Sequence, residues 1–238
     1  MREEILGGKY IYHYDDAVFP PSTDSFLLAA FAAPKKNDTV AELGAAAGLI
    51  ELLAAARDES LRFFHIELDA HAVELAKENF AANGLSDKVR FFTGDLRERS
   101  ILPGANSADY LIANPPYYPA ERGKCSVTMA AARSETACSF ADITKAARYL
   151  LRSAGRFAFV HRAERLAELC CILHENGFEP KRLRLVQHSP ASAPSLMLME
   201  ALNDGKPGLK CEPTLLLHDE NGHETEEYRQ IYHKEINL

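Results

Sequence analysis

Residues 181–202, KRLRLVQHSPASAPSLMLMEAL, decide the fold of this 238-residue chain. Two strand-like runs, 181–188 and 194–202, are joined by a link with little room for a helix. Strands joined so closely pair antiparallel, because a parallel pair needs a long crossover connection. We therefore expect the regular part of the chain to close with an antiparallel hairpin, and the preceding elements show which sheet the hairpin completes.

Upstream of this hairpin, strands alternate with helices. Hydrophobic periodicity predicts strands at 39–43, 61–68, 88–93, 108–113 and 155–161, and helices at 49–57, 70–83, 140–150 and 166–173. Such alternation is typical of a parallel, doubly wound α/β sheet. A mostly parallel, seven-stranded sheet that ends in an antiparallel hairpin is the Rossmann-like class I methyltransferase fold, as distinct from an ordinary dinucleotide fold.

The first 35 residues precede this alternation. Residues 9–19, KYIYHYDDAVF, predict two short strands around Asp15 and Asp16. A helix over 23–33 follows, with Thr23 or Asp24 as its N-cap and an end before Pro34. With 47% hydrophobic and 26% charged residues, the chain has an ordinary globular composition. We expect residues 1–238 to form a single domain, with residues 1–35 as an N-terminal extension.

Composition also excludes several classes of protein. No apolar run approaches the length of a membrane span, and no signal-peptide core is present, so we expect a cytoplasmic protein. The five cysteines form no CxxC pair, and the HDENGH stretch at 218–223 indicates a solvated turn; no metal site is predicted. The net charge of −7 argues against a protein that binds nucleic acid through charge alone. Local basic residues do gather at Lys145, Arg148, Arg152, Arg156, Arg162 and Arg165, where they indicate either a patch or solvated helix faces.

In open α/β sheets, ligands bind beyond the carboxyl ends of the strands. ELGAAAGL, 42–49, follows the first strand of the alternating region, and Gly44 and Gly48 would let its backbone turn tightly. Neither GxGxxG nor GxxxxGK is present, and the loop carries no basic residue. The loop therefore suits an uncharged or cationic end of a ligand, near the acid Glu42, or is simply a tight turn.

Acidic residues follow the next two strands. Glu67 lies 23 positions beyond Gly44, where an acid typically hydrogen-bonds ribose hydroxyls. Asp95, in TGDL, could accept a hydrogen bond from an adenine amino group. The alternatives are that Glu67 is a solvated strand end and that Asp95 only holds its own turn.

NPPYY, 114–118, follows the strand at 108–113. The prolines could merely break the strand, but this leaves the tyrosines unexplained. The side-chain oxygen of Asn114 and the carbonyl of Pro115 could each accept one N–H of a planar amine and make its nitrogen more nucleophilic. Tyr117 could stack on a flat base, a contact worth about 1–3 kcal/mol. No general base is needed, because the amine loses its proton only after it has become a cation.

Taken together, these motifs resemble those of S-adenosylmethionine-dependent amino methyltransferases. More narrowly, the chain is similar to the bacterial tRNA adenine-N6 methyltransferases, which modify the adenine just 3′ of the anticodon in a valine tRNA. The similar segments are STDSFLLA (22–29), NPPYY (114–118), AARSE (131–135), GRFAFVHRAERLAEL (155–169), GFEPKRLRLVQ (177–187) and HDENGHETEEYRQIY (218–232).

The resemblance implies a role for each matching position. The cofactor would be S-adenosylmethionine, and the partner would be the anticodon stem-loop of a tRNA, bound by a monomeric enzyme. The methionine part of the cofactor would lie against Glu42, Gly44, Ala45 and Gly48, its ribose against Glu67 and its adenine against Asp95. The target amine would be oriented by Asn114, Pro115 and Tyr117, with Thr23 and Asp24 closing over the site.

This sequence departs from the family pattern at three positions. Ala46 and Ser22 stand where the family usually has glycine, and Ser134 stands where it commonly has histidine. Ser134 belongs to a long linker, 119–135, which we expect to be disordered without RNA and to bring Lys124 and Arg133 toward phosphates.

Three alternative functions remain open from the sequence. The acceptor could be a protein glutamine amide, although enzymes of that kind carry a helical domain for which too little chain precedes residue 42. It could be a guanine N2 amine of ribosomal RNA. The chain could also be a cofactor-binding RNA module that has lost catalysis.

Overall fold

The computed structural model describes residues 2–5, 9–15, 17–18, 20–115 and 138–232, and its central feature is a nine-stranded mixed sheet. The strand order is β10-β8-β9-β7-β6-β3-β4-β5, and β11 also pairs with β8. The strands of this sheet are β3 (Thr39–Leu43), β4 (Arg62–Glu67), β5 (Val89–Thr93), β6 (Ala108–Ala113), β7 (Leu151–Arg162), β8 (Phe178–Gln187), β9 (Leu196–Asn203), β10 (Lys210–Cys211) and β11 (Leu215–Leu216).

The sheet confirms the predicted class I methyltransferase fold. Strands β3 to β7 are parallel, and β9 lies antiparallel between β7 and β8. These seven strands are the predicted ones. The two-residue strands β10 and β11 run parallel to β8 along its outer edge and were not predicted, because two residues are too few to show a strand period.

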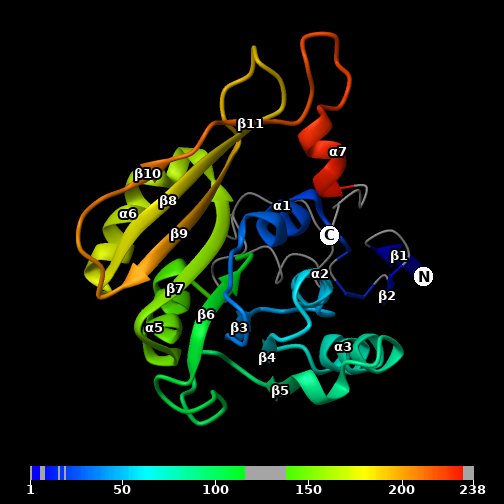
Figure 1. Ribbon diagram of the computed structural model, residues 1–238. Coiled ribbons are helices and arrows are strands. Elements are labelled where there is room, and N and C mark those ends of the chain that lie inside the picture. Colours follow the sequence, from blue (N-terminus) through cyan, green and yellow to red (C-terminus); the bar gives the residue numbers. More distant parts are fainter. Residues whose placement is uncertain (1, 6–8, 16, 19, 116–137, 233–238) are drawn as a thin grey trace.

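Helices cover both faces of the sheet (Figure 1). The apolar side chains of α1, α2, α3 and α7 share one core cluster with one face, whereas those of α5 and α6 share a second cluster with the other. The helices are α1 (Thr23–Phe31), α2 (Leu49–Arg57), α3 (Ala70–Ala82), α5 (Phe140–Leu150), α6 (Leu166–Glu175) and α7 (Glu226–Tyr232). Short 3-10 turns lie at Ser86–Lys88 and Ala163–Arg165.

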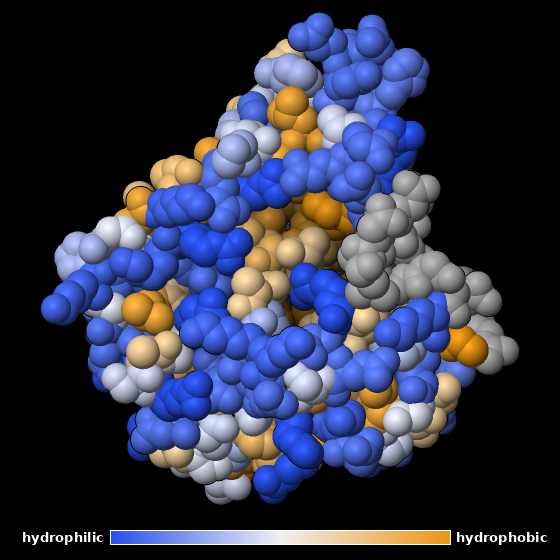
Figure 2. Space-filling model, viewed as in Figure 1, coloured by the Kyte–Doolittle hydropathy of each residue, from blue (hydrophilic) through white to orange (hydrophobic). Residues whose placement is uncertain are grey.

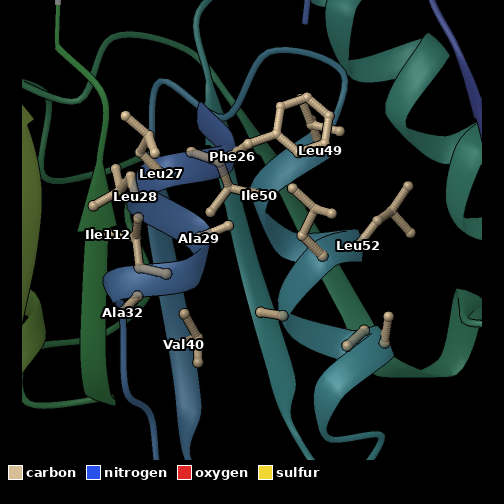
Figure 3. Close-up of a cluster of buried hydrophobic side chains, with 14 of the residues drawn as sticks. Phe26, Leu27, Leu28, Ala29, Ala32, Val40, Leu49, Ile50, Leu52 and Ile112 are labelled. Carbon is tan, nitrogen blue, oxygen red and sulfur yellow. The ribbon is translucent and has the colours of Figure 1, made fainter. Parts of the chain in front are cut away.

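Helix α1 packs on the sheet beside α2. Residues 25–29 of α1 are all buried, and its apolar side chains interdigitate with those of α2, β3 and β6 (Figure 3). The residues labelled in this cluster are Phe26, Leu27, Leu28, Ala29, Ala32, Val40, Leu49, Ile50, Leu52 and Ile112. Alanine and leucine suit this layer, because they favour the helix and lose little side-chain freedom in it.

The C-terminal end of α1 is anchored by polar side chains from other elements. The backbone N–H of Ala33 donates to the hydroxyl of Tyr110 on β6 at 3.0 Å. The guanidinium of Arg57, at the end of α2, donates to the carbonyls of Ala30 and Ala32 at 3.4 Å each. These bonds satisfy backbone groups that a helix end leaves without partners, and they fix where α1 lies on the sheet.

The N-terminal hairpin differs from the prediction. The predicted pair of strands around Asp15 and Asp16 is wrong, because β2 (Tyr10–His13) pairs antiparallel with β1 (Arg2–Ile5) upstream of it. The side-chain oxygens of Asn79 on α3 and of Asn83, its C-cap, accept from the backbone N–H groups of His13 and Ile11 at 2.6 and 2.8 Å. These amides bond the other edge of β2 and dock the hairpin on α3, a pairing that no local strand pattern reveals.

Candidate active site

The residues predicted to bind ligand lie at one edge of the sheet. In the strand register, Leu43 of β3 is opposite both Ala113 of β6 and Ile66 of β4, and Glu67 is opposite Thr93 of β5. Gly44, Asn114 and Asp95 follow these aligned strand ends within one or two residues. The structure therefore brings the glycine loop, Glu67, Asp95 and Asn114 to the same edge, where ligands of open α/β sheets bind.

The loop over 44–48 has an unusual backbone. Gly44, Ala46 and Gly48 all adopt left-handed φ values, +71°, +48° and +85°. Gly48 must remain glycine, because a Cβ there would lie 3.1 Å from the ring of Phe80. Around Gly44, by contrast, a Cβ would meet no atom within 4 Å, so this exposed backbone faces open space. The left-handed φ of Ala46 explains why the family pattern has glycine at this position.

Glu67 holds this loop in place. One carboxylate oxygen accepts from the backbone N–H of Ala46 at 2.9 Å, and the other accepts from that of Asp69 at 2.9 Å. The side chain is half-buried, so it is neither a merely solvated strand end nor fully enclosed. Each carboxylate oxygen has a second lone pair that could accept from a ligand hydroxyl.

Glu42 lies beneath the loop in a buried acidic cluster. Its side chain is 2% exposed, and its Oε2 has no hydrogen-bond partner among the described residues. Burial, followed by the nearby charges of Glu51 and Glu67, holds the pKa of Glu42 well above its ordinary value. Glu51 of α2 is fully buried and lies 2.8 Å from Nδ1 of His65, which is also fully buried. The sequence did not reveal Glu51 or His65, because α2 and β4 bring them together only in the fold.

Asp95 holds its own turn in this structure. It accepts from the backbone N–H of Arg97 at 2.9 Å and forms a bidentate ion pair with the Arg97 guanidinium. The hydrogen bond from Arg97 holds the pKa of Asp95 below its ordinary value. The half-buried carboxylate is thus charged and fixed at the strand edge, in a position from which it could also accept from an adenine amino group.

Asn114 is positioned by the first turn of α1. Its Nδ2 donates to the hydroxyl of Ser25 at 3.1 Å, which turns the amide oxygen away from Ser25. The hydroxyl of Ser25 lies 3.2 Å from that of Ser22, the N-cap. The prediction of Thr23 or Asp24 as the N-cap is wrong, because the Ser22 side chain accepts from the backbone N–H of Ser25. Ser25 is a further site residue that the sequence did not reveal.

The structure describes some of the other residues predicted to lie near Asn114, but not all of them. Thr23 and Asp24 lie half-buried on the first turn of α1, and Pro115 is buried. Tyr117 and the linker over 119–135, with Lys124, Arg133 and Ser134, lie outside the described residues.

Most of the basic residues predicted as a patch are paired with acids. Arg148 pairs with Asp204, Arg152 with Asp109, Arg156 with Glu200 and Arg165 with Glu168. These pairs neutralise the local charge, so they favour the interpretation of a solvated surface over that of a built phosphate-binding patch. Among the described residues, no cluster of His, Cys, Asp and Glu could hold a metal ion, and no helix is long and apolar enough to cross a membrane.

A groove lies away from the strand ends. Figure 2 shows a depression with an apolar floor and hydrophilic borders in the region of α1 and α7. This groove, of about 400 Å³, is lined by the later part of α1 together with β8, β9 and α7. Two of its arginines contact acids, Arg182 with Glu212 and Arg184 with Glu227, at 2.9 and 2.7 Å. It contains none of the residues predicted for the active site.

Known structures place this fold among the class I methyltransferases. The chain resembles the crystal structure of a "predicted O-methyltransferase" from Agrobacterium tumefaciens, with a TM-score of 0.73, 20% identity, and coverage of 89% of this chain and 96% of that one. It also resembles TrmN from Thermus thermophilus, with a TM-score of 0.53, 20% identity, and coverage of 75% of this chain and 48% of that one. At such identities the likeness concerns the fold alone.

Residues 21–172 match the methyltransferase small domain family, and the chain belongs to that family. The resemblance seen in the sequence is confirmed by relatives named tRNA1(Val) (adenine(37)-N6)-methyltransferase. The one from Shewanella halifaxensis is 30% identical over 165 residues, which are 68% of this chain and 67% of the relative. The one from Aliivibrio salmonicida is 25% identical over 223 residues, 92% of each chain. The protein is a methyltransferase whose cofactor is S-adenosylmethionine.

The residues at the strand edge fit this cofactor. The buried Oε2 of Glu42, without a partner among the described residues, suits a cationic group, and the backbone at Gly44, two residues further along the chain, faces open space. The N-terminus of α2, with Gly48 as a cap that has no side chain, adds backbone N–H groups.

Proposed function

We propose that this methyltransferase transfers the methyl group to the exocyclic N6 amine of an adenine in a tRNA anticodon loop. The observation that carries the proposal is the placement of Asn114. It follows β6 directly beside the glycine loop, and Ser25 fixes the orientation of its amide. The names of the relatives support adenine in tRNA as the substrate.

In the proposed chemistry, some residues of the chain orient the target amine and another stacks on the base. When bound, S-adenosylmethionine supplies a methyl group activated by its sulfonium. Asn114 and the backbone carbonyl of Pro115 accept the two N–H groups of the amine and draw its lone pair out of conjugation. Tyr117 stacks on the splayed base. Because these acceptors are positioned before the substrate arrives, little reorganisation is needed in the transition state.

We propose that the cofactor lies along the edge from β6 to β5. Glu42, Gly44, Ala45 and Gly48 would contact its methionine part, and Glu67 its ribose. Asp95 would accept from its adenine. Asn114 would border the transferred methyl, with Thr23 and Asp24 above it. We further propose that residues 1–238 act as one domain and as a monomer in the cytoplasm, where the enzyme meets tRNA.

Labelled methyl transfer from S-adenosylmethionine tests this function. The purified enzyme is offered total tRNA that lacks the modification, ribosomal RNA, or a release factor as acceptor. We expect label in tRNA alone, and nuclease digestion with mass spectrometry should identify the product as N6-methyladenosine. A matched valine tRNA transcript with guanine in place of the adenine 3′ of the anticodon should accept no label.

Other outcomes would overturn the proposal in distinct ways. Label in ribosomal RNA at a guanine, or in a glutamine of the release factor, would assign the same site to another amine. Binding of cofactor without label in any acceptor would indicate a module that has lost catalysis.

A further inference from the structure

Three titratable side chains beneath the glycine loop are not explained by the proposed chemistry of methyl transfer. Glu42 on β3 lies opposite His65 on β4 in the strand register, and Glu51 approaches His65 from α2. Glu42 is 2% exposed, and Glu51 and His65 are fully buried. Three ionisable groups buried together are costly unless each finds a partner or changes its protonation state.

The hydrogen bonding of this cluster is incomplete. His65 Nδ1 and Glu51 Oε2 are 2.8 Å apart, but Glu42 Oε2, Glu51 Oε1 and His65 Nε2 have no partner among the described residues. The ring of Phe91 lies 5.1 Å from that of His65. Unpaired buried atoms of this kind cost about 1–3 kcal/mol each in a merely structural site. The free oxygen of Glu42 therefore indicates a site that is completed by a ligand.

The charges that face Glu42 are acidic. They come from Glu51 on α2 and from Glu67 at the end of β4, whereas β6 places the apolar Ile112 opposite Glu42. Within the described part of the chain, no lysine or arginine forms an ion pair with Glu42. Burial and these two acids favour its neutral form, with a pKa well above the ordinary value. A cation arriving at this point would favour the charged form.

We propose that Glu42, buried beside Glu51 and Glu67, stays protonated until the cofactor arrives, so that the α-ammonium group of the cofactor binds in exchange for one proton. The O–H bond of Glu42 breaks, the proton leaves to solvent, and the carboxylate pairs with the ammonium; no covalent bond to the cofactor forms. Glu51, which His65 contacts at 2.8 Å, is thus a positioning residue that acts through Glu42. This inference rests on the proposed placement of the cofactor.

The sign of the pH dependence follows from this exchange. Bound cation lowers the pKa of Glu42, so a proton is released at any pH between the pKa of the complex and that of the free enzyme. Affinity therefore rises with pH across this window, by up to about tenfold per pH unit for one proton, and becomes constant above it.

Calorimetric titration with S-adenosylhomocysteine tests the exchange on the full-length wild-type enzyme. Measuring the heat in buffers of different ionisation enthalpy gives the number of protons released. Above the ordinary pKa of a glutamate, we expect close to one proton to be released, and a smaller number once the pH passes the raised pKa of Glu42 in the free enzyme. The control ligand is 5′-methylthioadenosine, which keeps the nucleoside but lacks the amino acid part, and it should release none.

Three variants assign the proton. Glu42→Gln should bind S-adenosylhomocysteine more weakly and release no proton. Glu51→Gln should lower the pH range over which a proton is released, because the neighbouring negative charge that raises the pKa of Glu42 is gone. Glu74→Gln, which removes an exposed acid paired with Lys77 on α3, should behave as wild type. Thermal unfolding of each variant shows that it is folded.

The results that would overturn the inference differ from those that would overturn the proposed function. Tight binding by wild type without proton release at any pH, or unchanged release in Glu42→Gln, would overturn the proton exchange alone. A complete absence of S-adenosylhomocysteine binding would overturn both the exchange and the placement of the cofactor. Binding with proton release but without methyl transfer to tRNA would support the exchange and count against the proposed substrate.

Discussion

Two buried glutamates on the same face of the sheet, Glu42 and Glu200, have opposite surroundings. Glu200 on β9 is 3% exposed, and its carboxylate lies 2.5 Å from the Tyr110 hydroxyl, 3.4 Å from Arg182 and 3.9 Å from Arg156. Glu42 is just as buried, but its Oε2 has no partner among the described residues and its charged neighbours are acids. Glu200 is satisfied by side chains of the protein, whereas Glu42 has a hydrogen bond from the backbone of Glu51 and an Oε2 without a partner among the described residues.

In the proposed mechanism, this difference separates the part of the sheet that stabilises the fold from the part that would perform the chemistry. The Tyr110–Glu200 pair joins β6 to β9 and, through Ala33, anchors the end of α1. The other end of α1 carries Ser25, which orients Asn114. A helix held firmly at one end can therefore position, at its other end, the amide that we propose to be catalytic. Local rules of good packing are typically broken at functional sites, as they are around Glu42.

The largest expected effect comes from removing the amide that orients the substrate. Asn114→Ala should lower kcat for methyl transfer by about 10²–10³-fold, as when a preorganised polar group is lost elsewhere. Cofactor affinity and the urea midpoint should change little, because the Tyr110–Glu200 pair that stabilises the fold is untouched. Asn221→Ala, in an exposed turn, is the control. Retention of most of the activity in Asn114→Ala would contradict the assignment.

Tyr110→Phe tests whether the Tyr110–Glu200 pair stabilises the fold. It removes the hydroxyl that serves both Glu200 and the N–H of Ala33, so we expect a loss of about 1–3 kcal/mol in the free energy of unfolding, measured in urea. The same change at the half-buried Tyr149 should have a much smaller effect. If Tyr110→Phe were as stable as wild type, Glu200 would not be the structural counterpart of Glu42.

Ser25→Ala should affect rate more than stability. It removes one hydrogen bond to Asn114, which we expect to reduce kcat by about fivefold, equivalent to roughly 1 kcal/mol. Ser60→Ala provides a matched loss of one hydroxyl, which accepts from the backbone N–H of Asn37 outside the site. Equal kcat values for the two variants would show that Ser25 does not position Asn114.

The smallest effect is expected in the glycine loop. Ala46→Gly should raise the unfolding free energy by about 1 kcal/mol or less, because relief of the left-handed φ exceeds the added freedom of the unfolded chain. Ala47→Gly, at the next and fully buried position, should destabilise instead. Thermal unfolding distinguishes the two variants, and destabilisation by both would show that Ala46 is unstrained.

The sequence revealed the parts of this molecule that depend on local pattern. The strand over 39–43, the helix over 49–57 and the strand over 108–113 have the predicted bounds, since apolar periodicity and glycine stops define them. The acids and Asn114 could be placed at one edge because parallel strands end there. The C-terminal helix α7 lay within a stretch recognised only by resemblance.

Contacts between distant segments could not be predicted in the same way. Glu51 and His65 are 14 residues apart and look like a polar helix position and a strand position until α2 packs on β4. Ser25 and Asn114 are separated by 89 residues, and Tyr110 and Glu200 by 90. Strand β1 was missed because its charged sequence, REEI, shows no apolar alternation. Each of these features depends on register or docking in three dimensions.

The measurement that tests this account most directly is the affinity of Glu42→Gln and Glu200→Gln for S-adenosylhomocysteine, together with their urea unfolding. Glu42→Gln should bind about 10–100-fold more weakly, as for the loss of one charge-assisted hydrogen bond. Its stability at neutral pH should be unchanged or higher. Because the pKa of Glu42 is raised in the folded state, folded wild type holds a proton that the unfolded chain loses. Wild type therefore loses stability as the pH rises from the ordinary glutamate pKa to the raised pKa of Glu42.

Glu200→Gln should show the reverse pattern, with a lower free energy of unfolding and an affinity within about twofold of wild type. Wild-type affinity in Glu42→Gln, or an equal loss of affinity in both variants, would contradict the division between a ligand-binding acid and a structural one.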